Sequence, residues 1–94
     1  MMYKFRPGIV LLQVCNVDLL VAKRELWESF PRIRPISKKC VLICKIMEKG
    51  INSDQAIIGF SRILNITIEE SHKKFDPIIK RLAEEGYLIP FEES

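Results

Sequence analysis

The hydrophobic pattern of this chain changes its period near residue 37, and this change constrains the fold more than any other feature of the sequence. Residues 8–14 read Gly-Ile-Val-Leu-Leu-Gln-Val, a run rich in β-branched residues, and the turn formers Asn16 and Asp18 separate it from the apolar residues 19–21. From Ser37 onward, apolar side chains recur at helical intervals instead. The sequence therefore predicts a β-hairpin followed by helices.

A third, short strand is predicted within residues 30–36, which read Phe-Pro-Arg-Ile-Arg-Pro-Ile. The two prolines place it at an edge of the sheet, because proline has no N–H to donate to a neighbouring strand. Pro31, Ile33 and Pro35 share one backbone parity, so their main-chain groups point to the same side. If that side is the open edge, Ile33 is the only N–H donor among the three.

Three helices are predicted, each between a capping residue and a stop signal: 38–49, 53–65 and 67–86, with Ser53 as the capping residue of the second. The third is the best marked, because residues 67–70 read Thr-Ile-Glu-Glu, a capping box, and Gly86 is a typical stop. Pro77 interrupts this helix and disfavours helical geometry at Asp76, which predicts a kink or a restart there. Residues 87–90 are predicted to be extended.

The composition agrees with a single domain spanning residues 1–94. The chain is 48% hydrophobic and 29% charged, as in ordinary globular domains. The predicted fold class is α+β. It comprises a three-stranded antiparallel sheet within residues 8–36 and three helices within residues 38–85, the last two forming a helix-turn-helix.

The charge is distributed unevenly along the chain. Residues 1–66 carry eleven Lys or Arg against five acidic residues, whereas residues 67–94 carry four against seven, for a net charge of +3. The basic first part either suits an acidic partner segment or is an ordinary solvated surface of mixed charge.

The sequence also bears on the expected compartment. No apolar run approaches the roughly 20 residues of a membrane span. The start, with Lys4 and Arg6, lacks the small-residue cleavage site of a signal peptide. We therefore expect a cytoplasmic protein without membrane contact. Three cysteines are an odd number and too few for a disulfide framework, so we expect reduced thiols.

Candidate metal-ligating and catalytic residues are few. Cys40 and Cys44 lie four residues apart on one face of a predicted helix, and are either ligands or, as we favour, small buried apolar residues. Cys15 lies in an apolar stretch predicted to be strand, and His72, the sole histidine, is predicted to face solvent. The glycines lack phosphate-binding spacing. We predict no enzyme activity, no catalytic residue, no cofactor and no metal.

The helix-turn-helix makes DNA a partner to consider, because the second helix of that motif offers its first residues to base edges. Here that helix opens with Glu69 and Glu70, whose carboxylates repel phosphate, although Lys73 and Lys74 follow. Nucleic acid is therefore not the expected partner. A winged-helix DNA-binding transcription regulator is kept as the alternative function.

Six segments, in this order, resemble the PqqD-like family over nearly the whole chain: 4–9 (Lys-Phe-Arg-Pro-Gly-Ile), 19–21, 33–37, 46–50, 68–70 and 82–88. The family consists of recognition elements for ribosomally made, post-translationally modified peptides. The resemblance implies a three-stranded sheet packed on a winged-helix-like trio of helices. It also implies a non-catalytic adaptor that binds the leader of a precursor peptide and presents it to a separate modifying enzyme, often a radical-SAM protein.

The resemblance further implies where the leader binds. In the family it adds as a strand beside the third strand and lies in a groove against the third helix. Carried onto this sequence, the peptide-binding residues are Arg32, Ile33, Arg34, Ile36, Lys74, Phe75, Ile78 and Arg81. Phe75 fits the core equally well, and Ile79 and Leu82 fit it better. The four basic residues either select an acidic leader or are ordinary exposed side chains.

A third hypothesis needs no precursor peptide. An exposed edge strand is a ready template for pairing with another chain, so a structural subunit that docks through this edge also agrees with the sequence.

Overall fold

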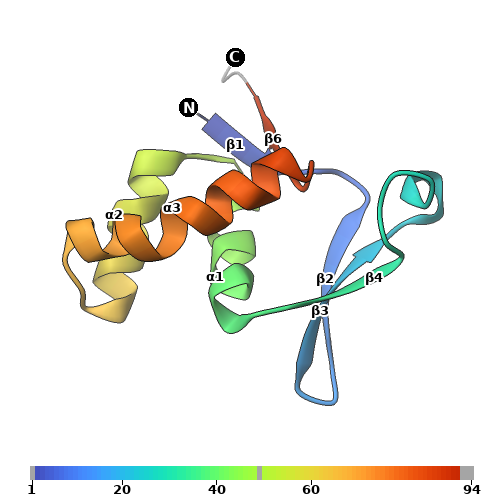
Figure 1. The fold of residues 1–94 in the computed structure, drawn as a ribbon, viewed down its shortest axis with the longest axis horizontal. Coiled ribbons are helices and arrows are strands. Elements are labelled where there is room, and N and C mark those ends of the chain that lie inside the picture. Colours follow the sequence, from blue (N-terminus) through green and yellow to red (C-terminus); the bar gives the residue numbers. More distant parts are fainter. Residues whose placement is uncertain (1, 49, 92–94) are drawn as a thin grey trace.

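A computed structural model describes residues 2–48 and 50–91. Within them the chain is α+β, with three helices and two antiparallel sheets of three strands each (Figure 1). The predicted fold class is confirmed. The predicted arrangement of one sheet followed by three helices is incomplete, because a second sheet joins both ends of the chain to the connection between the first two helices.

The first sheet, with strand order β2-β3-β4, consists of the three predicted strands. β2 (Ile9–Val14) and β3 (Val17–Ala22) form the hairpin, and β4 (Ile33–Ile36) pairs with β3 as an edge strand. The turn residues Cys15 and Asn16 both have positive φ, 50° and 65°, as a two-residue type I′ turn requires. Cys15 is exposed in this turn, which corrects its predicted place in an apolar strand.

A short 3₁₀ helix, η1 (Arg24–Leu26), lies in the connection from β3 to β4. Trp27, directly after it, donates its indole N–H to the carbonyl of Ala22 at 2.9 Å. This bond ties the connection back to the end of β3.

The second sheet has the order β5-β1-β6, with β1 (Met2–Phe5) between β5 (Ile51–Asn52) and β6 (Leu88–Pro90). β6 falls in the stretch predicted to be extended. The residues of β1 and β5 are all half-buried and show no alternation between buried and exposed positions, so no local period marks them as strands. Tyr3 pairs with Ile51 on one side and with Pro90 on the other, so β1 holds β5 and β6 in one sheet.

The three helices lie where they were predicted: α1 (Lys38–Met47), α2 (Ser53–Leu64) and α3 (Ile68–Glu84). α1 ends at Met47, before its predicted end at residue 49, which lies outside the described residues. α3 is one helix with Pro77 inside it, so the chain does not restart near Asp76.

Side-chain caps account for the helix starts. Thr67 caps α3 as predicted, because the Glu70 N–H donates to the Thr67 hydroxyl at 3.1 Å; this hydroxyl donates in turn to Glu70 Oε1 at 3.3 Å. The cap of α2 is Asn52 instead of the predicted Ser53, because the Asn52 side chain accepts the N–H of Asp54 at 2.8 Å. Asn52 thus ends β5 and starts α2.

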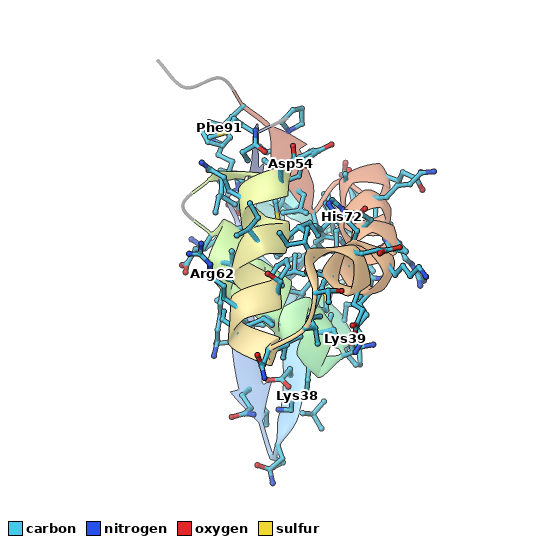
Figure 2. All side chains as sticks on the ribbon, turned by 90° about the vertical axis from the view of Figure 1, so that its left-hand side faces the viewer. Lys38, Lys39, Asp54, Arg62, His72 and Phe91 are labelled. Atoms are coloured by element: carbon cyan, nitrogen blue, oxygen red, sulfur yellow. The ribbon has the colours of Figure 1, made fainter. Side chains whose placement is uncertain are left out.

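The hydrophobic core lies among the three helices, and both sheets contribute side chains to it. Phe60 of α2 and Phe75 of α3 are fully buried and stack with their ring centres 4.3 Å apart. Leu20 of β3 and Met47 of α1 belong to the same cluster. Figure 2 views the domain with α2 toward the reader, and Arg62 projects outward from that helix. Burial of side chains of this size stabilises the fold by about 1.5–3 kcal/mol each.

Candidate functional site

A groove of about 530 Å³ lies between β4 and α3. Three elements line this β4–α3 groove. Arg34, Pro35, Ile36 and Ser37 come from β4 and the residue after it, Cys40 comes from α1, and Pro77, Ile78, Arg81 and Leu82 come from α3. The edge strand therefore supplies one wall and the middle of α3 the other.

The groove combines an apolar floor with a basic rim. Leu82 and Cys40 are buried beneath it, with 2% and 7% of their surface exposed. Ile78 is half-buried on the wall formed by α3. Arg34 is half-buried and Arg81 is exposed, so that two guanidinium groups stand over apolar side chains. Such a surface accepts an apolar side chain next to an acidic one.

Both arginines of the rim bind Glu85, the C-cap residue of α3. Arg81 donates its Nε–H to Glu85 Oε1 at 2.9 Å, and Arg34 donates to Glu85 Oε2. Burial raises the pKa of Glu85, but the hydrogen bond from Arg81 and the charge of Arg34 outweigh burial, so this pKa lies below its usual value. For Arg34 the effects have the opposite signs. Burial lowers its pKa, but the interactions with Tyr87 and Glu85 outweigh burial, so this pKa lies above its usual value.

A second hollow, of about 370 Å³, lies beyond the Arg34–Glu85 ion pair. Ser29, Phe30, Pro31 and Tyr87 line it together with that pair. The Tyr87 hydroxyl oxygen is buried and has no hydrogen-bond partner among the described residues. Arg34 lines both the groove and this second hollow, so the ion pair lies where the two hollows meet.

The open edge of β4 has an unusual set of hydrogen-bonding groups. The N–H of Ala22 in β3 donates to the carbonyl of Arg32 at 3.0 Å. Because antiparallel ladders alternate, Arg34 and Ile36 also direct their main-chain groups to β3, and Ile33 and Pro35 direct theirs to the open edge. Pro35 has no N–H, so within β4 the edge offers two carbonyls but only the Ile33 N–H, as the parity of the prolines predicts.

The structure brings four of the eight predicted peptide-binding residues together in the groove: Arg34, Ile36, Ile78 and Arg81. Phe75 lies in the core, stacked on Phe60, because its position on α3 faces α2. Arg32 stacks on Trp27, with its guanidinium carbon 3.9 Å from the ring centre, and does not line the groove.

The two other predicted residues also lie outside the groove lining. Ile33 is 59% exposed on the opposite face of β4 and offers only its main chain to the edge, and Lys74 is exposed on α3. Sequence reasoning missed Cys40, Pro77 and Glu85. The spacing of Ile78, Arg81 and Leu82 on one helical face could have marked Leu82 as a neighbour of the groove.

The two helical cysteines are buried, as we favoured in interpreting their spacing. The hydrogen bond between their thiols lowers the pKa of Cys40, and the charge of Arg34 acts in the same direction. The same hydrogen bond, together with burial, raises the pKa of Cys44. No group of three or more His, Cys, Asp or Glu side chains within residues 2–48 and 50–91 is arranged to hold a metal ion.

His72 belongs to α3 (Figure 2) and does not line the groove. Its Nδ1 is 2.8 Å from Asp76 Oδ2, one helical turn further along, and its side chain is 42% exposed. His72 is thus a surface histidine paired with a carboxylate, in agreement with its predicted solvent-facing position.

Among the described residues, no helix combines the length and the apolar character needed to cross a membrane. Comparisons of the chain with protein-family models, with curated proteins and with solved structures yield no match.

Proposed function

We propose that this chain is a cytoplasmic, non-catalytic adaptor of the PqqD-like type. It binds the leader of a ribosomally made precursor peptide by strand addition to β4 and presents it to a separate modifying enzyme, by family analogy a radical-SAM protein. The observation that carries the proposal is the β4–α3 groove itself, an apolar trough with a basic rim beside an unpaired strand edge. Strand addition uses such edges, where main-chain bonds supply affinity and side-chain pockets supply selectivity.

The edge of β4 limits how a peptide pairs with it. A peptide residue opposite Ile33 both donates to its carbonyl and accepts from its N–H, whereas a residue opposite Pro35 only donates. Each such hydrogen bond contributes about 0.5–1.5 kcal/mol net. The short ladder therefore gives modest affinity, and the groove has to supply the rest.

Side chains of the bound leader alternate between the groove and the opposite face of the sheet. An apolar side chain directed into the groove contacts Ile36, Ile78 and Leu82, while an acidic side chain two residues along the leader, on the same face, reaches Arg34 or Arg81. An exposed ion pair is worth only about 0.2–1 kcal/mol, so apolar contacts carry the affinity and charge adjusts the selection. We therefore expect a leader in which apolar and acidic residues are interspersed.

Titration of the chain with synthetic peptides, taken from short reading frames beside its gene, tests the proposal. Binding at micromolar concentration or tighter, with amide shifts at Ile33, Arg34 and Ile36 and at Ile78 to Arg81 but none at Arg62, is the expected result. Arg62 serves as the internal control because it projects from α2 (Figure 2). Shifts confined to other surfaces, or no peptide binding combined with salt-sensitive binding to duplex DNA, would reject it.

A further inference from the structure

The face of the β2-β3-β4 sheet that points away from the helices is entirely apolar. Cross-strand partners share a face, and the register places Val10, Leu12 and Val14 of β2 opposite Val21, Leu19 and Val17 of β3. β4 adds Ile33 and Pro35, the partners of Val21 and Leu19. We call these eight residues the outer sheet face. None of them carries an ionisable side chain.

The outer sheet face is open to solvent. Val10, Leu12, Val14, Val17 and Ile33 are 37–59% exposed, and they make up half of the ten large hydrophobic residues that are exposed in the described part of the chain. On the opposite face of the same sheet Leu20 is only 1% exposed and Ala22 only 4%. In Figure 1 the β2–β3 hairpin extends away from α2. An antiparallel sheet with one face to water normally carries polar residues there, and this one does not.

From this pattern we infer that the outer sheet face is a homodimer interface, covered by the same face of a second copy. Two sheets pack face to face about 10 Å apart with their strands within about 30° of each other, and apolar side chains from the two inner faces form the core between them. In a twofold interface the same patch is used twice, so it has to be complementary to itself. A patch without ionisable groups meets this condition, because the two copies, each of net charge +3, then meet without placing like charges together.

The size and chemistry of the face also favour a second copy over a membrane surface. Its exposed area is on the order of 500 Å² per copy, so a dimer buries roughly 1,000 Å² in total, at the lower limit of specific interfaces. We therefore expect a dimer that dissociates in the micromolar range. An interfacial membrane site instead combines apolar residues with Lys and Arg, and the outer sheet face contains neither.

This inference goes beyond the adaptor function and does not depend on it. Arg34 and Ile36 point to the groove side of β4 and Ile33 points to the outer sheet face, while Pro35 belongs to that face and also lines the groove. Dimerisation through that face leaves Arg34, Ile36 and the α3 wall of the groove uncovered. Loss of the dimer and loss of peptide binding are thus separate outcomes.

Sedimentation equilibrium of the full chain over micromolar to millimolar concentrations tests the interface. Leu12→Lys, at a residue 46% exposed on the outer sheet face, is expected to weaken dimerisation by at least roughly tenfold. Leu64→Lys is the matched control, at a leucine 42% exposed at the end of α2, and should dimerise as the wild type does. Circular dichroism and thermal melting establish that both variants are folded.

A second measurement keeps the test decisive if Leu12→Lys unfolds. Methyl NMR of the wild-type chain should show concentration-dependent shifts at Val10, Leu12 and Val17 and constant shifts at Leu64. A wild type that stays monomeric at every concentration would overturn the inference, because the outer sheet face would then not bind a second copy. A dimer that survives Leu12→Lys, or one that Leu64→Lys dissociates, would overturn it too, since the interface would then lie at a strand edge or at the α2–α3 end.

Discussion

Arg34 in β4 and Glu85 at the C-cap of α3 form an ion pair that joins the edge strand to the end of the helix. The two side chains keep 24% and 34% of their surface exposed, so solvent reaches the pair only in part. Arg81 binds the other oxygen of the same carboxylate. Both guanidinium groups of the groove rim are thus already paired with an acid of the protein itself, and an acidic ligand has to compete with Glu85.

This competition predicts that Glu85→Gln tightens the binding of an acidic leader peptide. The gain is expected to reach up to about fivefold, because partly exposed ion pairs contribute about 0.2–1 kcal/mol. Isothermal titration calorimetry measures it. Glu84→Gln makes the same change of net charge at an exposed neighbour that does not line the groove. Equal tightening by both variants would show that net charge alone acts.

The same ion pair predicts a dependence of stability on pH. The pKa of Glu85 is lowered in the folded state, so the unfolded chain binds this proton more readily. Glu85 therefore stabilises the fold above its unfolded-state pKa of about 4.3, and this contribution is lost as the pH falls through the lower folded-state pKa. In urea unfolding, the stability of the wild type should fall more steeply with acidification than that of Glu85→Gln. Parallel curves would contradict this.

Phe75 and Ile78 are expected to respond in opposite ways. Phe75→Leu removes a fully buried aromatic contact and should lower the free energy of unfolding by about 1–3 kcal/mol with little change in peptide affinity. Ile78→Ala trims the groove wall, so it should weaken peptide binding more than Arg34→Ala does. Urea denaturation and calorimetric titration of the three variants measure both quantities. The reverse pattern would place Phe75 in the binding site.

Ile33→Pro tests strand addition directly. The Ile33 N–H points to the open edge, so the substitution removes the sole donor of β4 there and leaves the hydrogen bonds to β3 in place. Peptide affinity should fall by roughly tenfold, the equivalent of one hydrogen bond. Ile33→Val keeps the N–H and serves as the control. Amide exchange at Leu20 and Ala22 reports whether the β3–β4 ladder survives, and unchanged affinity with an intact ladder would rule out pairing at this edge.

Local signals determined much of the fold and part of the groove. The capping box at Thr67, the turn at Asn16 and the helical stripes act within a few residues, so the sequence alone places the hairpin, the edge strand and the three helices. The parity of Pro31, Ile33 and Pro35 is likewise a property of the chain, and it predicts a single donor if they face the open edge. Ile78 and Arg81, which the resemblance to the PqqD-like family places on the groove-facing side of the third helix, do line the groove.

The tertiary structure decided the rest, because it depends on pairings between distant residues. β1 pairs with segments about fifty and about eighty-five residues away, and its own residues carry no period that marks it. Phe75 fits core or groove by spacing, and only the packing of α3 against α2 assigns it to the core. Cys40 reaches the groove from α1, and Glu85 meets Arg34 only once α3 lies against β4. Helical and strand periods specify which face of an element is apolar, but not which neighbour covers it.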